Sequence, residues 1–279
     1  NWGMTITDTL TKMMTEGGGV LKQADGCSTV RCPEASDPHG FDEAKEVAKE
    51  SDAVVILLGL AFDQYCLGFP NGNNDFCEAE GKDRDSIELP SSQKDLVLAA
   101  RASLGPSKIM IAVMIHGGAV ALDDETLDAL DAVVDAFYPG PHGAQAIADC
   151  LFGVFSPSGR LPVTFYRQTT DLPALDNMDW YPQENVSQGI SYRYFQGQVL
   201  YPFGHGLSYA EFKYTNFTTI NPSLSSSLSS SSSSSDPNMS IGPCDVVKMN
   251  IDVTNVGSVD SDEVVQCYVK QPHASVPVP

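Results

Sequence analysis

The sequence predicts an α/β protein with a mostly parallel sheet flanked by helices (an α/β sandwich), followed by an incomplete antiparallel β-sandwich. Up to Tyr209, apolar runs bounded by turn residues alternate with segments of helical periodicity, a pattern typical of a parallel sheet covered by helices. After Tyr209, residues 247–253 alternate between apolar and polar, and no helical pattern appears. We therefore expect an α/β domain over residues 1–209 and a β module over residues 210–279.

The elements of the first domain follow from periodicity in chain order. The apolar run 53–60 predicts a buried parallel strand, and the segment from Ser91 to Ser103 predicts a helix with a serine cap. A long loop, residues 62–89, separates these two elements. The complete set of expected helices and strands is helix 41–51, strand 53–60, helix 91–103, strand 108–115, helix 122–130, strand 132–138 and helix 143–151.

The second region contains two expected strands and a segment of low complexity. Residues 247–253 have the period of a half-buried strand, and residues 263–269 predict another strand after a turn with Gly257 and Asp260. Between the first strands of this module, residues 223–235 are nearly all serine. Such a segment cannot bury enough apolar surface to fold, so we expect an insert without fixed structure.

The charge balance excludes two classes of partner. Aspartate and glutamate outnumber lysine and arginine by 36 to 16, which gives a formal net charge of −20. This field repels nucleic acid and anionic membrane surfaces, so a neutral ligand is favoured. The longest apolar run, residues 53–62, is too short to span a bilayer.

Cysteine and histidine spacing gives little support to a metal site. The sequence has seven cysteines but no CxxC motif, and none of its five histidines lies at ligand spacing from a cysteine. No strand-to-helix turn carries a glycine-rich phosphate loop, so neither a metal nor an organic cofactor is expected. Three glycosylation sequons, at Asn185, Asn216 and Asn238, favour a secreted, extracellular protein.

The most informative segment is the acidic loop from Cys77 to Arg84. It places Glu78, Glu80 and Asp83 within six residues, after an apolar strand, where parallel sheets bind ligands. Neighbouring carboxylates raise one another's pKa, and a carboxyl group that keeps its proton can act as a general acid in glycoside hydrolysis. The competing interpretation is an acidic loop that is only solvated.

The same residues resemble a known family. Glu78-Ala-Glu-Gly-Lys-Asp-Arg with Leu89-Pro90 is similar to the acid/base loop of family 3 glycoside hydrolases, especially the β-xylosidase branch. Residues 255–266 resemble the start of the fibronectin type III-like module of that family. Further matching segments occur in the same order, at residues 26–32, 115–119, 138–140, 149–153, 157–162, 192–195 and 200–209.

The resemblance implies a retaining, exo-acting β-glycosidase, most simply a β-xylosidase of xylan breakdown. In that family an N-terminal (β/α)8 barrel supplies the nucleophilic aspartate and the α/β sandwich supplies the acid/base glutamate. No barrel is present here, so the chain is expected to be the C-terminal part of a longer enzyme and inactive alone. Its expected partners are the barrel and an oligosaccharide or glycoside substrate. The alternatives are a β-glucosidase, an α-L-arabinofuranosidase, or a carbohydrate-binding remnant without catalysis.

Three residues of the loop receive roles from this resemblance. Glu78 matches the acid/base residue. Glu80 is its competitor and is otherwise expected, with Arg84, to bind substrate. Arg84 could instead orient Glu78 or form a salt bridge within the loop. His116, at the end of a predicted strand, is interpreted as a satisfied histidine at a tight turn.

Overall fold

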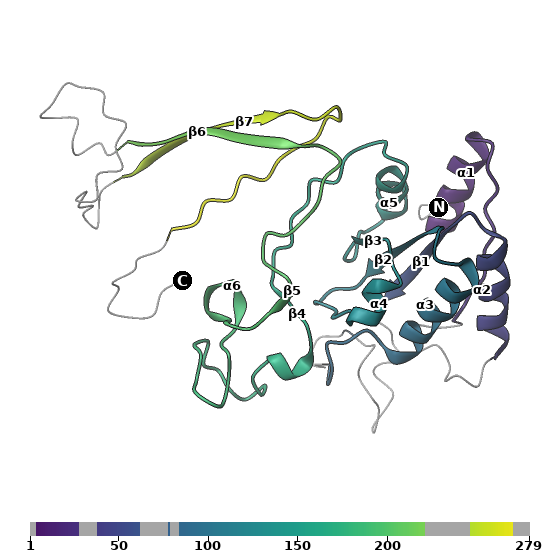
Figure 1. Cartoon of the computed structure of the whole chain (residues 1–279), viewed down its shortest axis with the longest axis horizontal. Helices are drawn as coiled ribbons and strands as arrows, with labels where there is room; N and C mark the ends of the chain where they lie inside the picture. The colour runs from purple at the N-terminus through teal and green to yellow at the C-terminus, as the bar shows by residue number, and fades with distance from the viewer. Residues whose placement is uncertain (1–3, 28–37, 62–77, 79–83, 221–245, 270–279) are drawn as a thin grey trace, which may run out of the picture. The chain divides into compact units, whose positions relative to one another are not determined.

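The computed structural model describes residues 4–27, 38–61, 78, 84–220 and 246–269 (Figure 1). The chain divides into two compact units. Unit 1 comprises Asn1–Val154, Arg160–Gly206 and Gln266–Pro279, and unit 2 comprises Phe155–Gly159 and Leu207–Val265. The division at residue 209 and the fibronectin-like character of the second module stay predictions.

Unit 1 is built on a parallel sheet of three strands, as the sequence predicts. The order is β1 (Ala53–Gly59), β2 (Ile109–Ile115) and β3 (Ala132–Asp135), and both pairings are parallel. The expected strand 132–138 is too long. It ends at Asp135 because Phe137 adopts a φ of 47°, which no strand residue can hold. The main chain turns there instead of continuing.

Helices flank this sheet. They are α1 (Ile6–Glu16), α2 (Pro38–Glu50), α3 (Ser91–Leu104), α4 (Asp124–Asp128) and α5 (Gly143–Leu151). α2 packs against α3, and α1 packs against α5. The prediction of a serine cap on α3 is wrong, because Pro90 occupies the N-cap position and makes no side-chain cap hydrogen bond. α4 has a side-chain cap, since Asp123 accepts a hydrogen bond from the Thr126 amide at 2.9 Å.

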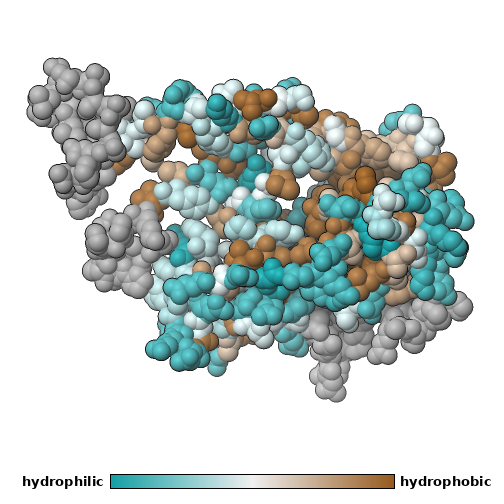
Figure 2. Space-filling view, viewed as in Figure 1, coloured by the Kyte–Doolittle hydropathy of each residue, from teal (hydrophilic) through white to brown (hydrophobic). Residues whose placement is uncertain are grey.

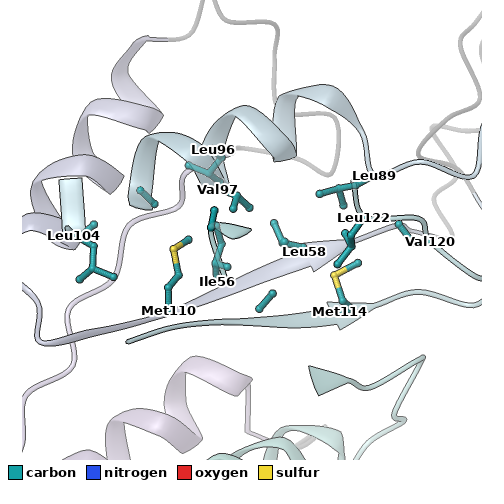
Figure 3. Close-up of a cluster of buried hydrophobic side chains, with 14 of the residues drawn as sticks. Ile56, Leu58, Leu89, Leu96, Val97, Leu104, Met110, Met114, Val120 and Leu122 are labelled. Atoms are coloured by element: carbon teal, nitrogen blue, oxygen red, sulfur yellow. The ribbon is translucent and has the colours of Figure 1, made fainter. Parts of the chain in front are cut away.

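The core lies between α3 and the sheet. Figure 3 shows Leu96 and Val97 of α3 above Ile56 and Leu58 of β1, with Met110 and other residues of β2 beside them. Burial of these side chains is the main stabilising contribution. The outer sides of the helices carry mostly hydrophilic residues on the face shown in Figure 2.

The carboxyl end of β1 is fixed by a buried amide on α3. The Gln93 side chain accepts a hydrogen bond from the Gly59 amide at 2.9 Å and donates one to the Gly59 carbonyl at 2.7 Å. Gly59 has a φ of 137°, and a Cβ there would lie 1.9 Å from the Ile115 carbonyl oxygen. Only glycine fits this position, so β1 can approach β2 closely just before the long loop 62–89 begins.

Unit 1 also contains short elements that the sequence does not predict. These are the antiparallel pair β4 (Phe165–Tyr166) and β5 (Val199–Tyr201), the 3-10 helix η2 (Thr169–Asp171) and the one-turn helix α6 (Ser191–Tyr194). Two main-chain hydrogen bonds join Leu161 to the 204–205 segment, at 2.7 and 2.8 Å.

Unit 2 contains an antiparallel pair, β6 (Phe212–Ile220) and β7 (Lys248–Asn255). β7 confirms the strand expected over 247–253. The strand expected over 263–269 is wrong, because these residues form no backbone ladder with the part of the chain that the structure describes. Instead, Gln266 donates a side-chain hydrogen bond to the Gly204 carbonyl at 2.9 Å. The serine-rich insert, 223–235, lies outside the described residues.

Candidate active site

Three chain segments meet where the parallel strands end. Glu78 follows β1, Gly117 and Gly118 follow β2, and Tyr138 follows β3. The Glu78 amide donates a hydrogen bond to the Ala61 carbonyl at 3.2 Å, just beyond β1. Ligand sites of parallel α/β sheets lie at this edge, because the loops after neighbouring strands converge there. Glu78 is therefore held at the position where the fold favours a site.

The Glu78 carboxylate accepts hydrogen bonds from both neighbouring strand ends. Its Oε1 accepts from the Gly118 amide at 2.7 Å, and its Oε2 accepts from the Tyr138 hydroxyl at 2.7 Å and from the Gly117 amide. The Arg84 guanidinium Nη2 lies 3.8 Å from Oε1. The Glu78 side chain is only 14% exposed. Each carboxylate oxygen thus has at least one donor, and the group has a defined orientation.

Arg84 lies beside Glu78, as its predicted role in orienting that residue requires. Its Nη2 also donates a hydrogen bond to the Ala119 carbonyl at 2.7 Å, so the guanidinium is anchored to the segment after β2. The Arg84 side chain is 11% exposed. Its role in substrate binding stays a prediction. Glu80, the competing acid and second expected substrate contact, lies outside the described residues.

The acidity of Glu78 differs from the sequence expectation. Burial raises its pKa, but hydrogen bonds from the Gly118 and Gly117 amides and the Tyr138 hydroxyl, together with the Arg84 charge, lower it more, so the pKa lies below its ordinary value. The expected rise in pKa is not found, because the groups around Glu78 among the described residues are hydrogen-bond donors and an arginine. Glu80 and Asp83, the acids expected to crowd it, lie outside the described residues. Burial and the hydrogen bond to Glu78 raise the pKa of Tyr138, so its hydroxyl keeps its proton and donates.

The two glycines are required by the close approach of Glu78 to the main chain. A Cβ at Gly117 would lie 2.9 Å from Cε2 of Tyr138 and 3.1 Å from Oε2 of Glu78. A Cβ at Gly118 would lie 3.2 Å from both Nη2 of Arg84 and Oε1 of Glu78. Side chains at these positions would displace the carboxylate from the amides that bind it.

Sequence reasoning did not assign Tyr138, or the neighbouring pair of His116 and Asp135, to the site. His116 is completely buried, and its Nε2 lies 3.2 Å from Oδ2 of Asp135. The rings of Phe137 and Phe165 pack around the imidazole, with centroids 5.3 and 6.1 Å away. The expectation of a satisfied histidine is wrong, because neither ring nitrogen of His116 has a hydrogen-bond partner among the described residues, although the imidazole is fully buried. The available signal was the placement of His116 directly after one expected strand and of Asp135 within the next one.

Other kinds of site have less support among the described residues. They contain no group of three or more histidine, cysteine, aspartate or glutamate side chains that could hold a metal ion. They also contain no helix long and apolar enough to cross a membrane. Cys27 is disulfide-bonded. A cavity of about 310 Å³ is lined by uncharged residues, 4–6, 139–141 and Ala144, and contains no acid or base.

The fold and this strand-end cluster define a class: an α/β domain that holds a carboxylate on main-chain amides at the carboxyl edge of a parallel sheet. Comparison with known proteins gives the family. Residues 1–209 match the Glycosyl hydrolase family 3 C-terminal domain, so the chain belongs to the family 3 glycoside hydrolases.

The curated relatives include both xylosidases and glucosidases. A probable beta-D-xylosidase 6 of Arabidopsis thaliana is 33% identical over 92% of this chain and 32% of its own length. A periplasmic beta-glucosidase of Salmonella typhimurium is 31% identical over 86% of this chain and 28% of its own length. The chain thus spans about a third of the length of the curated relatives it matches.

Solved structures agree with the fold. A GH3 exo-beta-xylosidase bound to a xylobiose aziridine probe matches with a TM-score of 0.60 and 28% identity, over 74% of this chain and 24% of that chain. A beta-glucosidase from Chaetomella raphigera matches with a TM-score of 0.63 over 92% of this chain and 33% of that chain. At 24% identity, this second match supports the fold alone.

Proposed function

We propose that this chain forms the C-terminal part of a retaining, exo-acting β-glycosidase, with Glu78 as its acid/base residue. The substrate is a terminal β-linked sugar, and xylose is the first choice because the first relative above is named a xylosidase. One observation carries the assignment of Glu78. It is a carboxylate held on two amides and a phenol at the carboxyl edge of the parallel sheet.

Glu78 has two tasks in this reaction. It protonates the glycosidic oxygen while an aspartate of the (β/α)8 barrel, contributed by the rest of the protein, attacks the anomeric carbon. It then removes a proton from the water that releases the sugar. In retaining enzymes the two carboxyl groups lie about 5 Å apart. The segment proposed here supplies one of them, so this chain without the barrel is expected to be inactive.

The lowered pKa of Glu78 fits the second task directly, because a base must be ionised. The first task requires a proton. An ionised aspartate about 5 Å away would raise the pKa of Glu78, since two neighbouring negative charges repel. Formation of the glycosyl-enzyme neutralises that aspartate. The pKa of Glu78 then falls to the value set by its own donors, and Glu78 becomes the base.

A neutral sugar agrees with the formal charge of −20, which disfavours polyanionic ligands. A β-glucosidase is the second candidate, because the Salmonella typhimurium relative is named one. An α-L-arabinofuranosidase and a carbohydrate-binding remnant are the remaining alternatives. Turnover of aryl xylosides, glucosides and arabinosides by the complete protein distinguishes the enzymes, and no turnover with retained oligosaccharide binding identifies the remnant. We also propose an extracellular location, based on the three sequons.

The test of Glu78 is the substitution Glu78→Gln in the complete protein. On glycosides with poor leaving groups, kcat/KM should fall by about 10²–10⁴, because protonation of the leaving group is lost. Azide should restore turnover of activated aryl glycosides, since it attacks the glycosyl-enzyme without a base. The control is Glu88→Gln, because Glu88 accepts hydrogen bonds from Ser86 and Thr169 and does not contact Glu78. Wild-type rates in Glu78→Gln would exclude the assignment.

A further inference from the structure

Glu78 receives hydrogen bonds from two kinds of donor among the described residues. The amides of Gly117 and Gly118 belong to the main chain, and the Tyr138 hydroxyl belongs to a side chain that contributes to no core cluster. A substitution cannot remove the main-chain donors without also adding a side chain that would displace the carboxylate. Tyr138, in contrast, is a side-chain donor to Glu78, so the substitution Tyr138→Phe can remove its hydroxyl alone.

The turn before Tyr138 contains strained backbone. Phe137 has a φ of 47°, an uncommon conformation for a bulky residue, and it directs the chain out of β3 one residue before Tyr138. The Phe137 amide donates a hydrogen bond to Oδ1 of Asp135 at 3.2 Å. Such a conformation persists only where its surroundings hold it.

Asp135 also connects this turn to the turn after β2. Its Oδ2 lies 3.2 Å from Nε2 of His116, the residue directly before Gly117. One half-buried carboxylate therefore contacts the residues that precede both Gly117 and Tyr138. Both are donors to Oε2 of Glu78. Through these two contacts, Asp135 holds the Gly117 amide and the Tyr138 hydroxyl in a defined arrangement relative to each other.

We propose that Tyr138 is a positioning residue of the proposed reaction: its hydroxyl holds Oε2 of Glu78 in place and stabilises the ionised form that acts as the base. This inference rests on the proposed role of Glu78. Tyr138 keeps its own proton throughout, because the reaction transfers protons between Glu78 and the substrate or water. Among the described residues, the charged group that faces Glu78 is the Arg84 guanidinium, whose Nη2 lies 3.8 Å from Oε1 of Glu78.

The test is Tyr138→Phe in the complete protein, with kcat/KM measured against pH. Loss of a hydrogen bond to a carboxylate raises its pKa, so the alkaline limb of the profile should move up by about one pH unit. A residue that only supports the fold would lower the rate without moving this limb. The thermal midpoint should stay close to wild type, because the ring is retained.

Tyr166→Phe is the matched control. The Tyr166 hydroxyl accepts a hydrogen bond from the Ser191 amide at 2.7 Å, and it does not contact Glu78. This variant also loses one hydrogen-bonded phenol hydroxyl, and its alkaline limb should stay at the wild-type pH. If Tyr138→Phe and Tyr166→Phe have the same pH profile, the role of Tyr138 is overturned.

Glu78→Gln separates this inference from the proposed function. Wild-type activity of Glu78→Gln would overturn both. Loss of activity in Glu78→Gln with an unmoved limb in Tyr138→Phe would overturn only the role of Tyr138. Should Tyr138→Phe fail to fold, Phe137→Gly provides the second variant, since glycine accepts the φ of 47° and loosens the turn. A wild-type kcat in Phe137→Gly would then overturn the proposal, and a reduced kcat with an unchanged KM would support it.

Discussion

The two ends of the parallel sheet each hold a carboxylate, an arginine and main-chain donors, yet they are arranged differently. At the amino end, Oδ2 of Asp131 lies 2.6 Å from Nη2 of Arg101 and accepts a hydrogen bond from the Met110 amide at 2.7 Å. At the carboxyl end, Glu78 lies 3.8 Å from Arg84 and accepts from two amides and a phenol. Both carboxylates have a lowered pKa.

Arg101 explains why the amino end is structural. Its Nε donates to the Ala129 carbonyl at 2.6 Å, and its Nη1 donates to the Lys108 carbonyl at 2.7 Å. One guanidinium thus joins the end of α3 to the segments that enter β2 and β3. A planar group with several donors in fixed directions is suited to such a joint.

The difference teaches which features mark a site. A lowered pKa and a nearby arginine occur at both ends, so neither identifies function. The carboxyl end differs in that two glycines expose amides to the carboxylate, and a strained turn directs a phenol to it. These features stabilise one orientation of the Glu78 side chain. At the amino end, in contrast, Arg101 stabilises the contact of α3 with the segments that enter β2 and β3.

Among the variants that test this comparison of the two ends, Gly117→Ala has the largest expected effect. The new Cβ would lie 2.9 Å from the Tyr138 ring and 3.1 Å from Oε2 of Glu78, so both groups must shift. A displacement of about 1 Å at a reacting group lowers activity roughly 100-fold, and we expect that loss in kcat/KM. The thermal midpoint should change little. Gly159→Ala is the control, because a Cβ there meets nothing within 4 Å. Equal activity of the two variants would contradict the requirement for glycine at position 117.

Arg101→Met should have the opposite signature, with loss of stability and retained activity per folded molecule. It leaves the carbonyls of Ala129 and Lys108 without their donor, and the Arg101 side chain is only 17% exposed. An unsatisfied buried polar group costs about 1–3 kcal/mol, so we expect about 2–3 kcal/mol in the free energy of unfolding. Urea denaturation measures this change. Lys12→Met, at an exposed position of α1, serves as the control. Equal denaturation midpoints for the two variants would contradict the structural role of Arg101.

The parts of the fold that depend on local pattern could be predicted from the sequence. The strands expected over 53–60 and 108–115 and the helix expected over 143–151 follow from apolar runs and helical periodicity. The structure confirms them as β1 (Ala53–Gly59), β2 (Ile109–Ile115) and α5 (Gly143–Leu151). The expected strand 263–269 failed, because alternation predicts an extended segment but not a partner for its ladder. The predicted end of the third strand, at residue 138, was wrong for a different reason, because the φ of Phe137 depends on its contact with Asp135.

The site could be predicted only in part. The loop motif indicates Glu78 and Arg84, and the structure brings these two together. The pKa direction was wrong, because the donors to Glu78 come from residues about 40 and 60 positions further along the chain. Tyr138 is an ordinary tyrosine at the end of an expected strand. Only the parallel register, which sets the carboxyl ends of β1, β2 and β3 side by side, gives it a role.

The smallest expected effect is on the acid sensitivity of the fold, and both ends should contribute to it. A carboxylate whose pKa is lowered by folding stabilises the protein above its ordinary value of 4.5 for Glu78, and this stabilisation is lost as the pH falls through the lowered pKa. The same sign holds for Asp131, from 3.8 downward. The thermal midpoints of Glu78→Gln and Asp131→Asn should therefore decline less than that of wild type between pH 6 and pH 3. The difference should be smaller for Asp131→Asn, because its carboxylate is half exposed and screened by solvent. The double variant should be flatter than either, since the two groups lie at opposite ends of the sheet and act independently. If the thermal midpoint of Asp131→Asn falls as steeply as that of wild type while that of Glu78→Gln does not, only the carboxyl end contributes to the acid sensitivity. The lowered pKa of a carboxylate would then distinguish the two ends.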